Sequence, residues 1–226
     1  MYRLAILFVL AGILATPMAY AQHPNAKVAL HIQTHVTKGS PCPAYTPAVC
    51  STFVTEGDIS TNYDIYMIIA QGDEFSDLAG VTVGIAYEGS TVATGTGIWN
   101  GGFTLCADLE FPQTAWPETG SGNVITFDAI SNCQNGNPGD GTQALIGAFY
   151  VYAYEASQFA LINHPASDKI AVANCSASEN DIPATSAGFV DFGGNLGCNP
   201  CLASCVPTPV EETTWGSVKT LFKGEE

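Results

Sequence analysis

Basic side chains are scarce in this chain of 226 residues, which has six Lys and Arg against 21 Asp and Glu and a net charge of −15. We expect Arg3 to leave with an export signal, so that five lysines remain and the net charge is near −16. These lysines are dispersed along the chain: Lys27, Lys38, Lys169, Lys219 and Lys223. Phosphate-binding surfaces need clustered Lys and Arg, so the sequence excludes nucleic acids and anionic membranes as partners.

Long apolar runs are also missing, apart from Leu4–Leu14, which has about half of the roughly 20 residues that a membrane-spanning helix needs. This run follows one basic residue and precedes Ala19-Tyr20-Ala21, a small-x-small cleavage pattern. We therefore expect residues 1–21 to be a signal peptide, the protein to be secreted, and the remainder to have no transmembrane segment. A retained anchor or a buried helix is the alternative. A lipid anchor is not expected, because the first cysteine is Cys42.

Catalytic signatures are missing too: the sequence has no Gly-x-Ser-x-Gly elbow, zinc-protease histidine pair or phosphate-binding loop. Two carboxylates for glycan hydrolysis need not be close in sequence, so that chemistry stays open. His31 and His35 lie about 13 Å apart on one face of an extended strand, too far to share a metal ion. We interpret them as part of a solvated polar face. His23 and His164 each precede a proline and are expected in loops.

Cysteine, in contrast, is abundant. An even number in an exported chain predicts four disulfides, formed by Cys42, Cys50, Cys106, Cys133, Cys175, Cys198, Cys201 and Cys205. Proximity along the chain favours Cys42 with Cys50, Cys106 with Cys133, and Cys175 with one of the last three. The C-x-x-C of Cys198 and Cys201 could also serve redox chemistry or bind zinc. It lies in a Gly/Asn/Pro-rich stretch without a second ligand pair, so structural disulfides are the preferred interpretation.

Alternating and apolar segments, separated by Gly- and Asn-rich turns, predict about nine or ten short strands and no helix before the C-terminal tail. The expected strands are 28–36, 63–70, 81–87, 91–99, 103–111, 123–130, 145–154, 159–162, 169–173 and 188–192. Tyr63–Ala70 is nearly continuously apolar, as a central strand covered on both faces would be. The sequence thus predicts an all-β, disulfide-stapled antiparallel β-sandwich over residues 22–205, followed by a linker and tail over 206–226.

One stretch carries a resemblance to a known fold. Tyr66–Ala70 is followed by the acidic turn Gly72-Asp73 and then by Leu78–Tyr87, an apolar strand with a Gly-led step that ends in Tyr. This order, found within residues 63–88, resembles cohesin-like and carbohydrate-module sandwiches. The resemblance implies an Ig-like or cohesin-like arrangement of the strands.

Two features are candidates for binding. Tyr150, Tyr152 and Tyr154 alternate with smaller or apolar residues, so they share one face of a strand. Facing solvent, they would form a flat strip for stacking on sugars or a protein; we favour the alternative that they lie in the core or under a loop. The loops Asn135–Asp140 and Asp191–Asn195 offer the oxygen ligands that calcium prefers, but they match no calcium-loop spacing. Ordinary turns are the preferred interpretation, so no cofactor is expected, and calcium is the alternative at these loops.

The C-terminal tail is the second specific signal. Pro207 and Pro209 break the domain, and a short amphipathic helix is expected after them, with one apolar face made by Trp215, Val218, Leu221 and Phe222. Residues 209–223 resemble an ending found on otherwise different secreted proteins of uncultured two-membrane bacteria. The resemblance implies a sorting or attachment role; the alternative is a helix that packs on its own domain.

The sequence therefore predicts a secreted, non-catalytic module for binding, adhesion or structure, associated with the bacterial cell surface and with a protein or glycan partner there. The alternatives are an extracellular glycan-active hydrolase and a subunit of an extracellular fibre. Paired carboxylates in a cleft would favour the hydrolase. An outward tyrosine strip would favour binding, and a detached terminal strand would favour the fibre.

Overall fold

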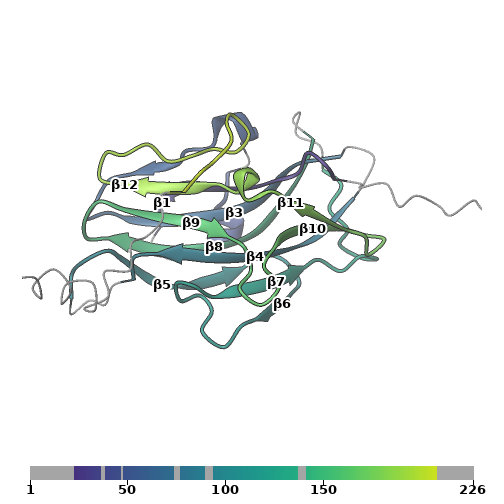
Figure 1. Cartoon of the computed structure of the whole chain (residues 1–226), viewed down its shortest axis with the longest axis horizontal. Coiled ribbons are helices and arrows are strands. Elements are labelled where there is room, and N and C mark those ends of the chain that lie inside the picture. The colour runs from purple at the N-terminus through teal and green to yellow at the C-terminus, as the bar shows by residue number, and fades with distance from the viewer. Residues whose placement is uncertain are drawn as a thin grey trace, which may run out of the picture.

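The computed structural model describes residues 23–36, 39–46, 48–73, 77–89, 94–136 and 141–207, which form a β-sandwich of two sheets (Figure 1). Its strands are β1 (Lys27–Thr34), β2 (Glu56–Gly57), β3 (Asn62–Gly72), β4 (Leu78–Tyr87), β5 (Ile98–Leu105), β6 (Leu109–Pro112), β7 (Gly122–Thr126), β8 (Thr142–Ala153), β9 (Ser157–Ile162), β10 (Ile170–Asn174), β11 (Glu179–Ile182) and β12 (Phe189–Phe192). The helical turns are α1 (Pro41–Ala44), η1 (Cys50–Thr52) and η2 (Ala184–Ser186). The expected all-β, disulfide-stapled sandwich is confirmed.

The four-stranded sheet has the order β1-β3-β8-β5, and every neighbouring pair is antiparallel. Its two central strands, β3 and β8, are the longest in the chain that the structure describes, with 11 and 12 residues. At the outer edge of β1, the Gly188 N–H donates to the Val28 carbonyl at 2.8 Å, so this edge is joined to the segment that leads into β12.

The eight-stranded sheet is organised around β4. One edge of β4 pairs with β7, which pairs with β6, and the other edge pairs in succession with β9 and β10. The loop 163–169 therefore interrupts what is in effect one long strand beside β4. Farther out, β12 pairs with β9 and β11 with β10, and β2 lies parallel to β12.

The core lies between the two sheets and is filled by the inward half of each alternating strand. Val28, Leu30 and Ile32 of β1 have exposed fractions of 0–4 %. Across the sandwich, the rings of Phe149 from β8 and Phe159 from β9 lie with centroids 5.0 Å apart. Full burial of such a side chain contributes about 1.5–3 kcal/mol relative to exposure, so the alternating pattern supplies much of the stability.

Two of the expected strands are wrong. Residues 91–99 and 103–111 were expected as separate strands, but β5 runs from Ile98 through the glycines to Leu105, and β6 begins at Leu109, in the other sheet. The chain crosses between the sheets at 106–108, where Cys106 forms a disulfide. The strands β2 and β11 were not predicted at all, because they are short and polar and pair at the sheet margins.

The expected number of disulfides is confirmed, but each predicted pairing is wrong. The bridges are Cys42–Cys106, Cys50–Cys201, Cys133–Cys175 and Cys198–Cys205. Three of them join residues 42 to 151 positions apart, because the fold brings distant segments together on the outside of the sheets. Proximity in sequence is a poor guide in a sandwich, where most neighbouring strands are distant along the chain.

Among the described residues, no helix is long and apolar enough to cross a membrane. The C-terminal tail with Trp215, Val218, Leu221 and Phe222 lies outside the described residues, as does the signal segment 1–21. The sorting role of the tail, its helix and the export signal therefore stay predictions.

Candidate functional site

The candidate site lies on the outer face of the four-stranded sheet, and strand register sets its layout. His31 of β1 faces Tyr66 of β3, and the next row along the strands places Asp64 of β3 beside Tyr150 of β8. One row farther, Tyr152 of β8 lies between Asn62 and Trp99. Polar and aromatic side chains thus follow one another in rows across the strands.

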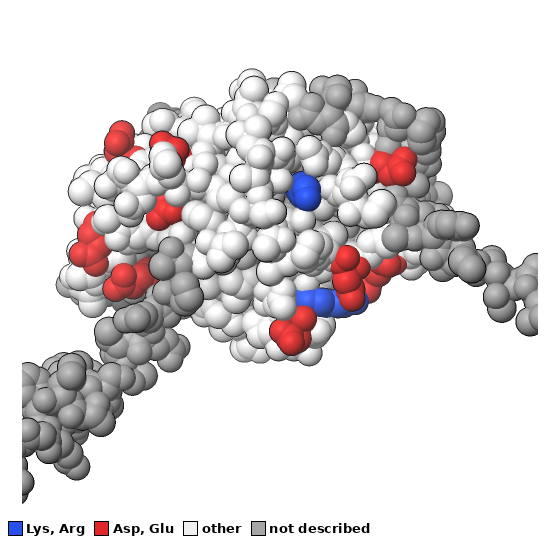
Figure 2. Space-filling view, turned by 45° about the horizontal axis from the view of Figure 1, so that its top comes forward, with Lys and Arg blue, Asp and Glu red and all other residues white. Residues whose placement is uncertain are grey.

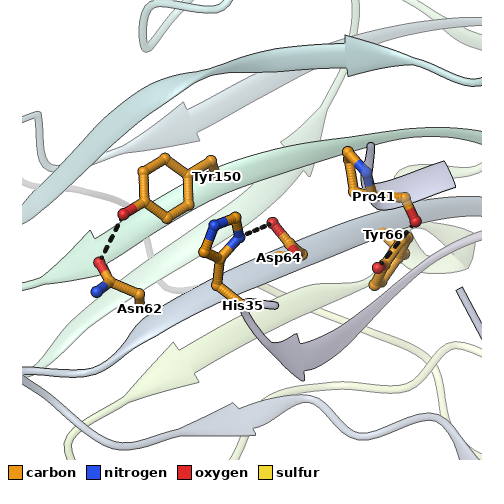
Figure 3. Close-up of polar contacts among 6 residues, drawn as sticks. All are labelled: His35, Pro41, Asn62, Asp64, Tyr66 and Tyr150. Atoms are coloured by element: carbon orange, nitrogen blue, oxygen red, sulfur yellow. Dashed lines mark hydrogen bonds and ion pairs between the residues drawn. The ribbon is translucent and has the colours of Figure 1, made fainter. Parts of the chain in front are cut away.

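One half of this face is buried under what we term the cover segment, residues 41–46 and 48–55. Its Tyr45 and Phe53 lie over His31, with ring centroids at 6.4 and 5.3 Å. The Tyr66 hydroxyl donates to the Pro41 carbonyl at 3.1 Å (Figure 3). Burial, together with the nearby Asp64 carboxylate, raises the pKa of Tyr66 to about 12. Tyr66 therefore stays a neutral donor that holds the cover segment.

Disulfides fix the cover segment at two places. Cys42 is bonded to Cys106 directly after β5, and Cys50 is bonded to Cys201 near the C-terminal end of the domain. Asn199 adds a buried hydrogen bond of 2.6 Å to the Cys50 carbonyl. The cover segment is thus a fixed part of the fold.

His31 belongs to the covered half, so its interpretation as part of a solvated polar face is wrong. Its exposed fraction is 6 %, and its Nδ1 accepts a 2.8 Å hydrogen bond from the Val54 N–H. Burial lowers the pKa of the His31 imidazole below its usual value. The ring is therefore a neutral anchor for the cover segment.

The other half of the outer face is uncovered by described residues, and we term it the aromatic face. It comprises His35, Asn62, Trp99, Tyr150, Tyr152 and Tyr154, which are all partly or fully exposed. The tyrosines lie outward while Phe149, Val151 and Ala153 fill the core. The part of the interpretation that put the tyrosines in the core is thus wrong, because their rings lie on the outer face of the sheet.

Ring contacts set the shape of the aromatic face. The His35 ring lies 4.4 Å from Tyr150, and Trp99 meets the same tyrosine edge-on at 5.5 Å. Tyr152 and Tyr154 make a second edge-on contact at 4.8 Å. Because each ring is held by another, the face loses little side-chain entropy when a partner binds.

Hydrogen bonds orient the same side chains. His35 Nδ1 lies 2.9 Å from an Asp64 carboxylate oxygen, and the Tyr150 hydroxyl donates to the Asn62 amide oxygen at 3.0 Å (Figure 3). The Asp64 side chain is only 4 % exposed. It therefore positions the His35 ring, while His35, Asn62 and the aromatic rings can touch a partner. The sequence contained these residues, but only the register shows that they meet.

The histidines expected in loops, His23 and His164, are outside the named strands but buried, with exposed fractions of 0 and 7 %. His23 Nδ1 accepts from the Asp73 N–H at 3.1 Å, and its Nε2 lies 3.3 Å from the Asp77 carbonyl. Burial lowers the pKa of His23. It joins the start of β1 to the β3–β4 connection and has a structural role.

The candidates for metal binding are one group of possible ligands among the described residues and the two loops proposed for calcium. Among the described residues, one group of possible ligands lies close together: Asp77, Cys133 and Cys175. The two cysteines are joined in a disulfide and offer no thiolate. Of the proposed calcium loops, only the first two residues of Asn135–Asp140 are described. In Asp191–Asn195, Gly193 and Gly194 have positive φ values of 85° and 93°, as in a turn. Calcium binding at either loop stays a prediction.

No family model matches the sequence, and no curated protein matches it significantly. Among solved structures, a cohesin module from a family 33 glycoside hydrolase of Clostridium perfringens is similar, with 9 % identity and a TM-score of 0.43. The match covers 74 % of this chain and 97 % of that module. A type II cohesin domain from the cellulosome of Acetivibrio cellulolyticus has 10 % identity and a TM-score of 0.39, covering 70 % and 88 % of the two chains.

Proposed function

We propose that the protein is a secreted, non-catalytic binding module that associates with the bacterial cell surface and binds its partner through the aromatic face. The observation that carries this proposal is that the rings of Trp99, Tyr150 and Tyr152 lie together on the outer face of the sheet. Trp and Tyr are enriched at binding surfaces because they combine a large apolar ring with a polar group. A soluble domain has little other reason to leave such rings uncovered side by side.

The covalent state supports the extracellular part of the proposal. Four disulfides form and persist in oxidising compartments and are rare in the cytosol. The expected signal peptide at residues 1–21 would deliver the chain to such a compartment. During export, the tail at 206–226 would direct the chain to the cell surface, where the aromatic face meets the partner.

The test is retention on the cell envelope. Envelope from the cells that make the protein is mixed with the purified wild type, a W99A/Y152A double variant, and F111A as a matched control. Phe111 is a 62 % exposed aromatic residue on β6 of the other sheet. The wild type and F111A should sediment with the envelope, and the double variant should stay in solution. If the double variant sediments like the wild type, the aromatic face is not the binding surface.

A second candidate function, glycan hydrolysis, has one observation in its favour. Asp191 of β12 and Glu56 of β2 are register neighbours on parallel strands, which places their backbones about 4.8 Å apart. Burial raises the pKa of the Asp191 carboxyl, as a general acid requires, and Gln158 donates to it at 3.1 Å. Turnover of a soluble polysaccharide that D191N and E56Q each abolish would establish the hydrolase; no turnover by the wild type would leave the binding module.

A further inference from the structure

We propose that the partner of the aromatic face is a neutral glycan chain, an inference that rests on the proposed binding function. Three properties of this face point to that ligand: its small extent, its fixed rings with adjacent polar groups, and its lack of described cationic side chains.

The extent of the aromatic face suits a short ligand. The six described residues of the face lie beside the half that the cover segment buries, where Tyr66, Ile68 and Ala148 each have an exposed fraction of 1 %. A stable protein–protein interface uses about 20–30 residues on each side. A few sugar rings need far less area, so the size of the uncovered surface favours a glycan over a folded protein.

The rings and polar groups are arranged for sugars. A pyranose presents C–H groups on its flat side and hydroxyls around its rim, so it needs an aromatic surface with donors and acceptors beside it. Trp99 and Tyr152 are register neighbours on β5 and β8, and Asn62 continues the same row on β3. The Asn62 amide oxygen accepts from Tyr150, and its amide nitrogen carries two donors for a ligand hydroxyl.

Charge selects among glycans. Neither a Lys nor an Arg is among the six described residues of the aromatic face, and the Asp64 carboxylate lies beside His35. The described lysines lie elsewhere. Lys27 donates a hydrogen bond to the Ser186 hydroxyl, and Lys169 forms an ion pair with Glu179. Figure 2 shows one side of the whole molecule, on which acidic side chains outnumber basic ones, in line with the net charge of −15. Sulfated and sialylated glycans would be repelled, so the preferred ligand is uncharged.

The experiment is a glycan array of neutral, sialylated and sulfated glycans probed with the protein, followed by calorimetric titration with neutral hexasaccharides of β-1,4-linked glucose, xylose and mannose. We expect neutral glycans to bind and charged ones to bind more weakly. W99A and Y152A should each weaken the hexasaccharide at least about tenfold, as loss of an interface hot spot does. F111A should bind like the wild type, and melting curves identify variants that fail to fold.

The inference is overturned if no glycan binds, if charged glycans bind best, or if folded W99A and Y152A both bind the hexasaccharide like the wild type. Its failure is distinguishable from failure of the proposed function. If W99A/Y152A no longer sediments with the envelope and the wild type binds no glycan, the aromatic face binds another class of partner and the binding function stands. If the wild type binds no glycan and the double variant still sediments with the envelope, both proposals fall.

Discussion

Gly101 has a direct part in forming the aromatic face. It lies at a register shift of β5 against β8, and a Cβ atom built on it would be 2.6 Å from Tyr150 Cδ1 and 2.7 Å from Trp99 Cη2. Both rings occupy space that only a glycine leaves free. The absence of one methyl group therefore determines where two rings of the aromatic face lie.

We predict that G101A displaces Trp99 and Tyr150, weakens hexasaccharide binding, and lowers the free energy of unfolding by about 1–3 kcal/mol, as overpacking does. The control is G136A, because a Cβ at Gly136 would meet no atom within 4 Å. Calorimetric titration and thermal melting measure the two effects. Equal binding by G101A and G136A would show that the ring positions do not matter for the ligand.

Two buried histidines make the stability of the fold depend on pH. Burial lowers the pKa values of His23 and His31 from the usual 6.5, and each accepts a backbone N–H at Nδ1. Their contribution to the free energy of unfolding is fully present above pH 6.5. It is lost as the pH falls from 6.5 through the pKa values that the two histidines have in the folded state. The pKa of Asp191 is raised by burial. Protonation of this carboxyl at low pH therefore increases the stability of the fold and opposes the effect of the histidines.

We therefore predict that the melting temperature falls between pH 7.5 and about pH 5, and that H23Q/H31Q shows a shallower fall, since Gln can accept the same hydrogen bonds without titrating. Melting curves of both proteins in a series of buffers give the slopes. An identical slope for the double variant would mean that other groups cause the dependence.

At the scale of elements, the cover segment divides the outer sheet face into a buried half and the aromatic face. Its apolar contacts with Tyr66, Ile68 and Ala148 make β3 a strand covered on both faces, as its continuous apolar sequence predicts. The cover segment itself is short and Pro-rich. Its location depends on two disulfides to distant parts of the chain.

We predict that C50A/C201A lowers the free energy of unfolding more than C198A/C205A does, because the bridges close segments of 151 and 7 residues. The chain-entropy argument gives about 4–5 kcal/mol for the long segment and about 2 kcal/mol for the short one. Urea unfolding of the two variants tests this order. Loss of the Cys50–Cys201 bridge should also release the cover segment and increase the binding of a hydrophobic dye to C50A/C201A. A larger loss of stability in C198A/C205A than in C50A/C201A would contradict the prediction.

The sequence was sufficient to predict the strands whose side chains alternate or are continuously apolar, such as β3, β4 and β8. It was insufficient to predict contacts that depend on the pairing of segments distant along the chain. Burial of His31 depends on a segment about twenty positions farther along the chain, and the meeting of Trp99 with Tyr150 depends on the β5–β8 register. Alternation showed that the tyrosines share a face, but it could not say which face is inside.

For the whole molecule, we predict that the oxidised protein has no titratable thiols under denaturing conditions, because all eight cysteines are paired. A thiol reagent added to unreduced protein in guanidinium measures this, and reduced protein serves as the positive control. Two or more reactive thiols per chain would contradict the four bridges.

We also predict that a chain ending at Cys205 keeps the melting temperature of the full protein but loses its surface location in the cells that make it. Cys205 is fully buried, and its N–H donates to the Thr185 carbonyl at 2.8 Å, so the domain is closed at that residue. Melting curves and cell fractionation measure the two effects. A fall of many degrees would show that the tail completes the domain, and the sorting role would lose its basis.

The Cys50–Cys201 bridge has a mechanical consequence for a module held by its C-terminus. Tension applied at Val206 enters through Cys201 and Cys205, crosses to Cys50, and reaches β5 through the Cys42–Cys106 bond. The load therefore passes along covalent bonds to the strand that carries Trp99, without first shearing β12 from its neighbours. A ligand on the aromatic face and a pull at the C-terminus are thereby connected by a covalent path of two sulfur bridges and two short backbone segments, 42–50 and 201–205.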